Sequence, residues 1–566
     1  PNGKADRKAL PEPIGSINTG TEYVEPTGII ERKLAKIWQE VLGALRVGIN
    51  DDFFELGGDS IKAIQVISLL AREGIDIEVE DILVYRTISR ILLNTDYKNN
   101  LKEYEQGVAE GSFGFTPIVQ WFFSRGFSNP GYYNQSVLLE LKKDIDITNL
   151  EKAFKKIVEH HDGLRLNYSP DTKELYFNNE HLHKGFKIET FDISGLALEK
   201  QEQEMERIGV KLKSEFDITD GLLIKVAVIN FGVSGRKLLI TIHHLVIDGV
   251  SWRIILEDLY TVYTSIENQR KVIMPKKSAS LKECYERMRT LKDSPRLLEE
   301  KEFWISSDSV GFKLPEDYET LDWSISARAS VKGRLGKGET AKLVKEAHKA
   351  YNTCVEDLLL TALAKTINEW TGSREMVIEM ENHGRNIDGI DVSRTVGWFT
   401  VMYPLRLEIT RDNTGEQIRE IKEQIREVPE NGIGYGILKY LGGDMPENRG
   451  RVPELRFNYL GRFDKEANND FFAYSDLYSG SDTCSTNPIT AKLEINCMVV
   501  NDVFELDIYF NKKTYKEETI LNLRDKYLGN LMDTVFYTTT SDDVYFTPSD
   551  FETLDINQED LDMLFD

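Results

Sequence analysis

The first hundred residues carry apolar side chains at the spacing expected for short amphipathic helices. Behind Pro26, apolar residues recur at steps of three and four, which predicts a first helix. A second helix is expected to begin at Ser60, bury a stripe of isoleucine and leucine, and stop at Gly74. A third is expected over about 79–93. Such short helices predict a small, compact all-α bundle over 26–95.

A polar and weakly periodic stretch, 96–112, predicts a linker between this bundle and one large domain over 113–566. In that domain the apolar pattern switches between the periods of strands and helices. The predicted strands are 137–141, 222–230, 237–244, 376–381, 401–407, 493–500 and 504–510, with helices at 148–160 and 340–351 between them. This mixture predicts an α/β architecture in two lobes, with an N-lobe over about 113–295 and a C-lobe over about 300–566.

Composition narrows the range of partners. The chain has 94 acidic and 70 basic side chains, and its net charge of −24 argues against general binding to nucleic acid or anionic membranes. Four cysteines without a CxxC pair argue against a structural metal site and favour a reducing, cytoplasmic setting. No apolar run is long enough to cross a bilayer. A start at Pro1 instead of methionine indicates a piece of a longer protein.

One hydroxyl stands out in the stretch FFELGGDSIKAIQV, where the second helix begins. Ser60 lies where a helix N-terminus leaves backbone N–H groups free, an environment that suits an anion such as a phosphodiester. Asp59 or Ser60 could also do no more than cap the helix, as such residues usually do. The extended string, however, resembles the attachment motif of peptidyl carrier proteins of nonribosomal peptide synthetases.

That resemblance covers 26–95 and implies that Ser60, which follows Asp59, carries a covalent 4'-phosphopantetheine arm installed by a phosphopantetheinyl transferase. The arm would hold an aminoacyl or peptidyl group as a thioester. Residues 1–20 resemble the end of an adenylation domain, including the lysine that such domains use, Lys4. The resemblance therefore implies an adenylation domain as the upstream partner.

The predicted strand 237–244 ends in two histidines, and strand alternation would turn His243 and His244 to opposite sides. His244 shares its side with isoleucines, so we expect a partly buried imidazole that titrates near neutrality and suits proton transfer. Paired histidines alone are more often structural or exposed. Together with Asp248 and Gly249 they form HHxxxDG, which resembles the motif of the condensation and epimerization superfamily, with its chloramphenicol acetyltransferase-like fold.

The superfamily resemblance implies that His244 is catalytic, with His243 beside it. It also implies that Asp248 is a structural anion, for which we expect Arg165 as the partner. The nearby string HHDGLR, 160–165, lacks the xxxDG spacing and is interpreted as a helix end that supplies this arginine.

A further string bears on the choice between condensation and epimerization. ENHGRN begins at Glu381 and resembles the EGHGRE motif of epimerization domains, with Asn382 and Asn386 in place of glycine and glutamate. The resemblance implies that Glu381 is a second catalytic group, supported by His383 and Arg385. Other strings of the kind found in epimerization domains are VGWFT at 396–400, NGIGYGIL at 431–438 and FNYLG at 457–461.

Epimerization inverts Cα by removing a proton from one face and returning a proton to the other. We expect His244 and Glu381 to flank this carbon from the two lobes, with the pKa of Glu381 raised by burial. Asn458 and Tyr459 are expected near the substrate, where backbone N–H groups would stabilise developing negative charge.

Two other functions stay open from the sequence. A condensation domain shares HHxxxDG and would join two tethered acyl groups into an amide. A non-catalytic binding module would explain Asn382 and Asn386 as marks of a lost activity. The acidic end, 557–566, predicts a short helix that packs on the large domain or docks to the condensation domain of a downstream partner synthetase.

Overall fold

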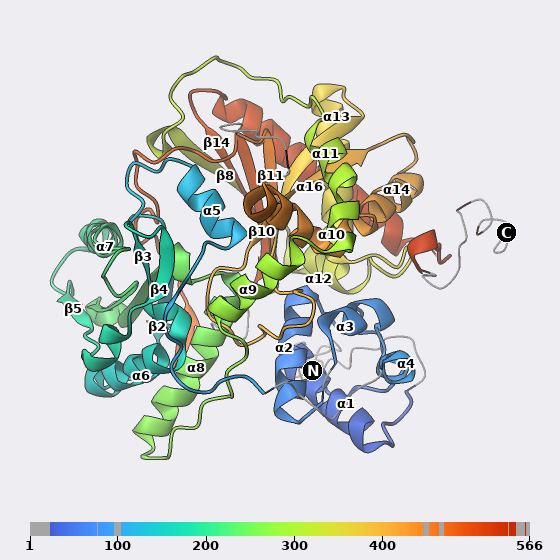
Figure 1. Ribbon diagram of the computed structural model, residues 1–566. Helices are drawn as coiled ribbons and strands as arrows, with labels where there is room; N and C mark the ends of the chain where they lie inside the picture. The colour runs from blue at the N-terminus through green and yellow to red at the C-terminus, as the bar shows by residue number, and fades with distance from the viewer. Residues whose placement is uncertain are drawn as a thin grey trace, which may run out of the picture. The chain divides into compact units, whose positions relative to one another are not determined.

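The computed structural model of the chain divides into two compact units, residues 1–102 and 103–566. The structure describes residues 23–75, 77–95, 103–443, 445, 452–462, 469–541, 543–550, 558 and 561. The segment 1–20, which includes Lys4, lies outside the described residues, as do the first part of the predicted linker and all but two residues of the predicted C-terminal helix. Figure 1 colours the chain from blue at the N-terminus to red at the C-terminus.

Within its described residues, the first unit is a bundle of four short helices, drawn in blue in Figure 1. They are α1 (Ile29–Leu42), α2 (Ser60–Arg72), α3 (Val79–Tyr85) and α4 (Ile88–Asn94). Apolar side chains from all four helices meet in one core, where buried Trp38 packs edge-on against Phe53 with 4.9 Å between the ring centroids. The predicted all-α bundle is confirmed, and Gly74 stands just behind α2.

The predicted third helix, 79–93, is two helices in the structure. α3 ends because Arg86 adopts the left-handed backbone conformation, with φ of 58°. The Arg86 guanidinium pairs with Asp52 at 2.9 Å, and Thr87 then caps α4 by accepting the Arg90 N–H. The prediction of one helix was wrong because apolar side chains on both sides of the break enter the same core, so the periodicity does not reveal the break.

The N-lobe of the second unit is built on a sheet with the strand order β12-β2-β7-β6-β5. Its strands are β2 (Asn134–Leu141), β5 (Glu189–Asp192), β6 (Ile224–Asn230), β7 (Arg236–His243) and β12 (Phe472–Tyr474). Its helices are α5 (Pro117–Ser124), α6 (Ile147–His160), α7 (Leu198–Ser214) and α8 (Gly249–Glu267), and α6 packs along α8 (Figure 1). The pairing of β2 with β7 brings Asn134 opposite His243.

A small sheet and several further helices also belong to the second unit. The small sheet has the order β1-β4-β3, with β1 (Ser112–Phe113), β3 (Leu166–Ser169) and β4 (Glu174–Phe177). The helices are α9 (Leu281–Leu291), α10 (Pro295–Glu299), α11 (Lys301–Asp308), α12 (Lys337–Lys345), α14 (Thr414–Arg426) and α15 (Ile433–Gly436). Among the described residues, no helix is both long and apolar enough to span a bilayer.

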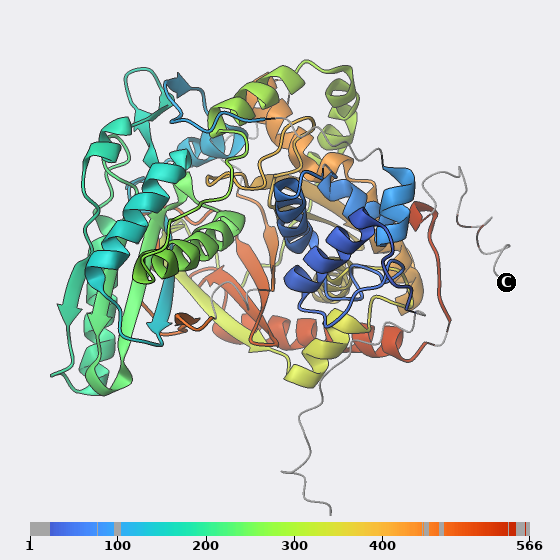
Figure 2. The same ribbon diagram turned by 90° about the horizontal axis from the view of Figure 1, so that it is seen from below.

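The C-lobe is built on a second sheet, with the order β10-β9-β11-β13-β14-β8. Its strands are β8 (Arg328–Arg334), β9 (Glu375–Asn382), β10 (Val401–Glu408), β11 (Leu455–Arg462), β13 (Leu493–Val500) and β14 (Val503–Asn511). Two helices, α13 (Val355–Thr371) and α16 (Glu517–Thr539), pack against each other and against this sheet; α16 is the long red helix in Figure 2. The opposite face carries charged and amide side chains from alternate positions of β9, β11 and β13.

Each predicted strand is present, so the two-lobed α/β architecture is confirmed. One strand from the last quarter of the chain, β12, joins the N-lobe sheet, where it pairs antiparallel with β2. The predicted helix 340–351 is α12, which ends earlier, at Lys345. Beyond it, buried Ala347 and Ala350 continue the apolar pattern in turns, which explains the overestimated length.

Candidate active site

Ser60 stands at the first position of α2, behind a tight glycine turn. Gly57 has φ of +85°, which residues with a side chain rarely adopt, and a Cβ on Gly58 would overlap with the buried ring of Phe53. Asp59 caps α2 by accepting a backbone N–H of the first turn at 2.8 Å. The two glycines and the aspartate thus determine where the serine hydroxyl stands.

The capping role belongs to Asp59, which leaves the Ser60 hydroxyl for other chemistry. Ser60 is half-buried, and its hydroxyl makes no hydrogen bond to any residue that the structure describes. It lies at the N-terminus of a 13-residue helix, where free N–H groups and the helix dipole favour a negative charge. The surroundings of Ser60 therefore fit a phosphodiester attached through its oxygen.

The first histidine of HHxxxDG holds the chain in place. His243 is fully buried at the end of β7, and its Nε2 lies 2.7 Å from the carbonyl oxygen of Pro130. Its Nδ1 accepts the Leu245 N–H at 3.1 Å. Both ring nitrogens are therefore occupied by backbone groups, and His243 braces the turn that follows the strand.

His244 lies outside β7, because the strand ends one residue earlier than predicted and a 3₁₀ turn begins here. Its Nδ1 is 2.9 Å from the Ile247 carbonyl oxygen, and its Nε2 is 2.9 Å from the amide nitrogen of Gln135. The half-buried ring packs against Tyr133 and Trp398, with centroid distances of 5.4 and 4.2 Å. Burial lowers the pKa of His244, so the neutral imidazole predominates at pH 7.

Two tryptophans and an arginine connect His244 to Glu381. The ring of Trp398, which stacks on His244, lies 6.2 Å from that of Trp121. The Arg456 guanidinium lies over Trp121 at 5.7 Å, and its Nε is 3.6 Å from a carboxylate oxygen of Glu381. The imidazole of the N-lobe and the carboxyl of the C-lobe therefore border one aromatic wall.

Glu381 stands near the end of β9, on the polar face of the C-lobe sheet. Its Oε2 accepts a hydrogen bond from Asn458 Nδ2 at 2.8 Å, and 21% of the side chain stays exposed. Burial raises the pKa of Glu381 to about 7. The Arg456 guanidinium opposes this rise in the pKa, and the negative charges of Glu494 and Glu379 add to it.

Asp248 is not paired with Arg165, and this prediction was wrong. Asp248 caps α8 by accepting the Ser251 N–H at 2.7 Å, and both of its oxygens accept from Arg385, at 3.0 and 3.1 Å. Arg165 is buried just beyond α6 and pairs with Asp162, three residues away. The partner of a buried carboxylate depends on which chain segments cross it, and here the loop behind β9 crosses it.

Arg385 ties the loop behind β9 to α8. Besides Asp248, it donates to the carbonyl oxygens of Val392 and Thr395 at 2.8 and 2.7 Å. Gly384 has φ of +63°, and a Cβ there would overlap with the carbonyl oxygen of Phe399. The loop therefore folds back onto the segment that carries Trp398, and only glycine fits at the point of closest approach.

The neighbouring residues of ENHGRN serve the same loop. His383 Nδ1 accepts the backbone N–H of Arg385 at 3.1 Å, and Asn382 Oδ1 accepts the backbone N–H of His383 at 2.7 Å. The amide oxygen of Asn386 is buried without a hydrogen bond to any described residue. The asparagine at 382 thus stabilises a tight turn of the backbone next to Glu381.

Near the site, one predicted residue lies on an unexpected face of the sheet, and two residues that were not predicted make contacts. Tyr459 follows Asn458 on β11, so strand alternation points it to the opposite face of the sheet, and its place near a substrate stays a prediction. Sequence reasoning missed Arg456, although it stands two positions before Asn458 and therefore on the same face. Gln135 gave no sequence signal, because its contact with His244 arises only when β2 lies beside β7.

Two small cavities adjoin the aromatic wall. The first, of about 30 Å³, is apolar and includes Trp121 and Trp398 in its lining. The second, of about 80 Å³, includes Trp121 and Glu379 and has a more polar lining. Both share Trp121 and Tyr440, so these rings stand where the two cavities adjoin.

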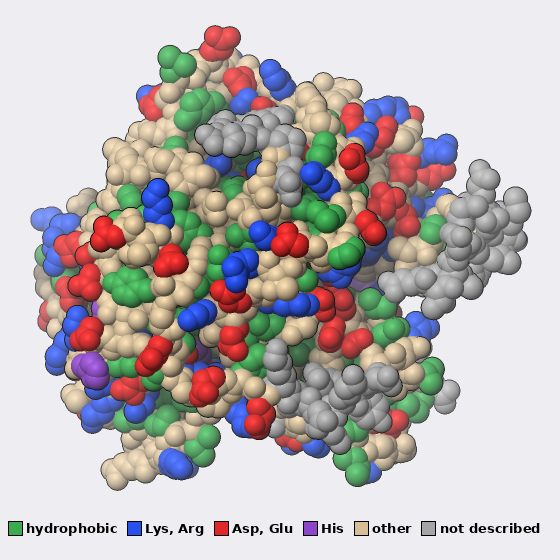
Figure 3. Space-filling model, viewed as in Figure 1, with side chains coloured by type: hydrophobic (Ala, Val, Ile, Leu, Met, Phe, Trp, Pro, Cys, Tyr) green, Lys and Arg blue, Asp and Glu red, His purple; other side chains and the backbone are tan. Residues whose placement is uncertain are grey.

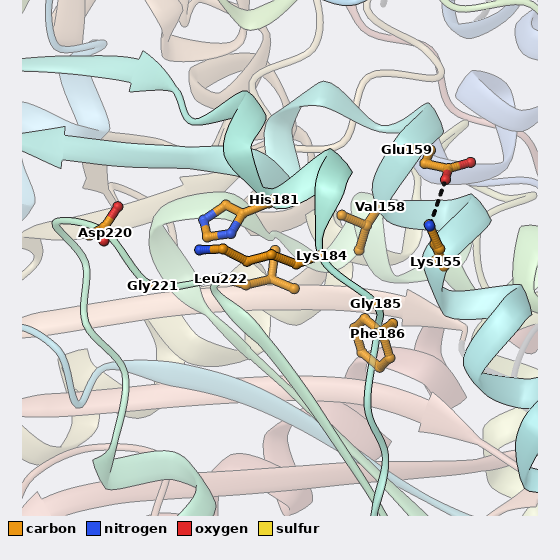
Figure 4. Close-up of a pocket in the computed structure, with 10 residues that line it drawn as sticks. All are labelled: Lys155, Val158, Glu159, His181, Lys184, Gly185, Phe186, Asp220, Gly221 and Leu222. Carbon is orange, nitrogen blue, oxygen red and sulfur yellow. Dashed lines mark ion pairs between the residues drawn. The ribbon is translucent and has the colours of Figure 1, made fainter.

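A further cavity, of about 230 Å³, lies in the N-lobe, and its lining includes no predicted site residue (Figure 4). Lys155 and Lys184 line it together with acidic Glu159 and Asp220, so the charges balance. The visible surface is similar, since acidic and basic side chains are interspersed over the face shown in Figure 3. Neither the cavity nor this surface therefore favours an anionic over a cationic ligand.

Comparison with known proteins yields two family matches. Residues 113–557 match the family model of the Condensation domain, and residues 32–92 match that of the phosphopantetheine attachment site. Surfactin synthase subunit 1 of Bacillus subtilis (strain 168) is 38% identical over 579 residues, which are 100% of this chain and 16% of that protein. Gramicidin S synthase 1 of Brevibacillus brevis is 36% identical over 586 residues, 100% of this chain and 53% of that protein. The chain therefore spans about half or less of the length of these relatives.

Solved structures agree with the family matches. The crystal structure of the epimerization domain from the third module of tyrocidine synthetase B is 32% identical and covers 78% of this chain and 99% of its own, with a TM-score of 0.72. The first condensation domain of the calcium-dependent antibiotic synthetase, 17% identical, covers 76% of this chain and 98% of its own, with a TM-score of 0.58, and shows the shared fold alone. The predicted carrier bundle with its phosphopantetheine site and the predicted chloramphenicol acetyltransferase-like fold class are confirmed.

Proposed function

Because this chain belongs to the Condensation domain family and carries a phosphopantetheine attachment domain ahead of it, we propose that it inverts the Cα stereocentre of an acyl group held on Ser60. The substrate is an aminoacyl or peptidyl thioester, converted from the L to the D form. One observation supports this most: His244, whose pKa is lowered by burial, and Glu381, whose pKa burial raises to about 7, border a common aromatic wall from the two lobes.

The reaction moves one proton off Cα and one back on. The arm on Ser60 supplies the thioester that makes the Cα–H bond acidic. One of His244 and Glu381 accepts the α-proton, the electron pair of the C–H bond shifts toward the thioester carbonyl, and the other residue returns a proton to the opposite face. A neutral imidazole is a competent base, and a carboxyl with a pKa of about 7 is present in both protonation states at neutral pH.

The neighbouring residues hold these two groups in place. Asn458 orients the Glu381 carboxyl through its hydrogen bond. His243 braces the turn that presents His244, and Asp248 and Arg385 join α8 to the loop that carries Trp398. His383 belongs to the same loop. Arg165 has no part in this arrangement, since it pairs with Asp162 beyond α6.

Condensation is the second candidate, because it shares the HHxxxDG motif. Amide formation calls for an imidazole near the acyl carbon but for no second acid or base across the substrate. A carboxyl whose pKa is raised to about 7, on the same aromatic wall as His244, therefore favours epimerization. The 32% identity to an epimerization domain over most of this chain supports the same choice.

The proposal extends to the partners of a longer protein. An adenylation domain upstream would load the arm, and a phosphopantetheinyl transferase would install it. A condensation domain of a partner synthetase downstream would accept the epimerized group. The size of the relatives supports this arrangement, since this chain covers only 16% of surfactin synthase subunit 1.

Deuterium exchange tests the reaction directly. The holo protein is loaded at Ser60 with an L-aminoacyl group in deuterated water, and the released amino acid is analysed for chirality and for deuterium at Cα. Epimerization predicts a mixture of L and D forms with label at Cα. Unlabelled L product from a fully loaded protein contradicts it, and amide formation with a second loaded carrier would support condensation instead.

Three variants assign the roles. Ser60→Ala is expected to abolish loading. His244→Ala and Glu381→Gln are expected to load normally but to slow label exchange by about 100-fold or more, because each loses one acid–base group. Lys337→Ala, at the exposed start of α12, serves as a control for both steps. Exchange at the normal rate in either active-site variant would refute the assignment.

A further inference from the structure

Gln135 is held in one orientation between two ring nitrogens. Its Oε1 lies 2.9 Å from Trp252 Nε1, and its Nε2 lies 2.9 Å from His244 Nε2. An indole nitrogen only donates hydrogen bonds, so the atom that faces Trp252 must be the amide oxygen. The amide NH₂ group of Gln135 therefore faces His244.

This orientation determines which nitrogen of His244 carries the proton. An amide NH₂ group only donates, so His244 Nε2 must accept from it and is unprotonated. The proton is on Nδ1, which donates to the Ile247 carbonyl oxygen at 2.9 Å. The four groups form one directed chain, from the Trp252 indole through Gln135 and His244 to a backbone carbonyl.

We propose that Gln135 is a positioning residue that, together with Trp252, holds His244 as the neutral Nδ1–H tautomer, in which the lone pair of Nε2 accepts from the Gln135 amide until substrate displaces it. The catalytic use of this lone pair rests on the proposed epimerization, whereas the tautomer itself does not. During turnover the α-proton would arrive at Nε2 and displace the N–H of Gln135, while the electron pair of the C–H bond shifts toward the thioester carbonyl.

The same chain disfavours the imidazolium. A proton on His244 Nε2 would point at the NH₂ group of Gln135, so two donors would face each other. Turning the amide by half a rotation would relieve that conflict but would bring its NH₂ group against the Trp252 indole N–H. Trp252 is only 4% exposed and has little access to water as a substitute acceptor. Gln135 and Trp252 thus act in the same direction as burial, which lowers the pKa of His244.

Other charged groups around His244 do not mask the effect of Gln135 on the pKa of its imidazole. The carboxylates that act on it are Asp248 and Asp482, and both are paired with cations. Arg385 binds Asp248 at 3.0 Å, and Lys213 lies 3.1 Å from Asp482. Neither carboxylate is hydrogen-bonded to the imidazole within the described residues, so Gln135 is the side chain that contacts Nε2.

The remaining titratable neighbours are uncharged near pH 7. Burial lowers the pKa of His243 to about 4, so its ring is neutral. Burial also raises the pKa of the Tyr133 phenol well above its usual value. A titration near neutrality at this turn would therefore report on His244.

Ring-nitrogen NMR of the holo protein with ¹⁵N-labelled histidine tests the tautomer, and His244→Asn identifies its signals among the eight histidines. At pH 7 we expect an unprotonated Nε2 and a protonated Nδ1. Gln135→Glu keeps the acceptor for Trp252 but replaces the donor by a carboxylate. This change is expected to protonate Nε2 and to raise the pKa of His244 by about one to three pH units.

The activity readout separates this effect from a loss of structure. Gln135→Glu should slow label exchange by about tenfold or more at pH 7 and move the pH optimum of exchange to higher pH, because the pair of His244 and Glu381 then keeps its protons to higher pH. Gln135→Met, which removes the donor without adding charge, should mix the two tautomers and leave the pH optimum in place. Trp252→Phe should mix them as well, because the amide is then free to turn. Gln120→Glu adds the same charge at an exposed position of α5 and should change neither readout.

The outcomes distinguish the two proposals. A protonated Nε2 in the wild-type protein, or an unchanged titration of His244 in Gln135→Glu, overturns the role of Gln135. If the wild-type protein shows the expected tautomer but exchanges no deuterium, epimerization is rejected and the positioning role of Gln135 stands. If exchange proceeds while Nε2 is protonated at rest, epimerization stands and the positioning role is rejected.

Discussion

Burial raises the pKa of Glu381, and three charged residues on the same face of the C-lobe sheet modify that rise. Arg456 donates two hydrogen bonds to Glu379, at 2.8 and 2.5 Å, and stands at 3.6 Å from Glu381. Arg456 is therefore paired mainly with Glu379. Glu494 stays ionised because nearby arginines lower its pKa despite burial. Burial, together with the negative charges of Glu494 and Glu379, outweighs the effect of Arg456, so the pKa of Glu381 is raised to about 7.

Replacing Glu494 by glutamine tests this account at the level of one residue. The substitution removes a negative charge and keeps the shape, so the pKa of Glu381 should fall by about half a pH unit or more. Exchange requires one proton on the pair of Glu381 and His244, which predicts a bell-shaped pH profile. The loss of activity on the alkaline side, near pH 7 in the wild type, should move to lower pH.

The matched control for that substitution is Glu505→Gln on β14, which changes an exposed carboxylate of the same sheet. Its pH profile should coincide with that of the wild-type protein. An alkaline limb that does not move in Glu494→Gln would show that Glu494 has no influence on the pKa of Glu381.

At the scale of elements, the site depends on a loop fastened to a helix of the other lobe. The loop behind β9 is held to the N-terminus of α8 by the pair of Arg385 and Asp248, and Phe399 N–H donates to Asp248 as well. This fastening places Trp398 against His244. The position of Trp398 beside His244 therefore depends on one buried ion pair.

Gly384→Ala probes this fastening. The new Cβ would overlap with the Phe399 carbonyl oxygen at a backbone conformation with φ of +63°, so the loop must shift. We expect the free energy of unfolding to fall by about 2–4 kcal/mol, measured by urea denaturation, and exchange to slow more than tenfold.

Gly338→Ala provides the comparison, because a Cβ at this position of α12 meets no atom within 4 Å. This variant should be as stable as the wild type or slightly more stable, since alanine favours helix, and it should exchange label normally. Equal stability of the two variants would contradict a tight closure at Gly384.

At the scale of the whole molecule, the carrier and the large domain are separate folding units joined through one chain. The core of the first unit closes on its own apolar residues, which explains why a short bundle suffices to hold Ser60 in its turn. In the proposed function, delivery of the tethered group to the second unit is an intramolecular event. Its rate depends on the effective concentration that the covalent connection provides.

Cutting that connection tests the dependence. A protease site inserted between Lys102 and Glu103 allows the same loaded protein to be measured before and after cleavage. At micromolar concentration, exchange should slow by about 10- to 100-fold after the cut and rise with protein concentration. The uncut protein with the insertion should behave as the wild type. A rate independent of both cutting and concentration would contradict delivery by a tether.

Local sequence was sufficient to predict those features whose interacting residues are close together along the chain. The glycine turn, the cap and the serine of the carrier lie within four residues, and the two histidines and Asp248 lie within six. Alternation and periodicity located every predicted strand, because one face of each strand is buried. They did not reveal the break at Arg86, where the apolar stripe runs on across two helices.

What the sequence alone determined, then, are the turns, the caps and the segments that carry Ser60, His244 and Glu381. Only the tertiary structure decided that Arg385, rather than Arg165, pairs with Asp248, and that Gln135 contacts the imidazole. The physical reason is that hydrogen bonds and ion pairs between distant segments depend on how strands and loops cross in space. A pattern of neighbouring residues does not predict which distant segments will meet.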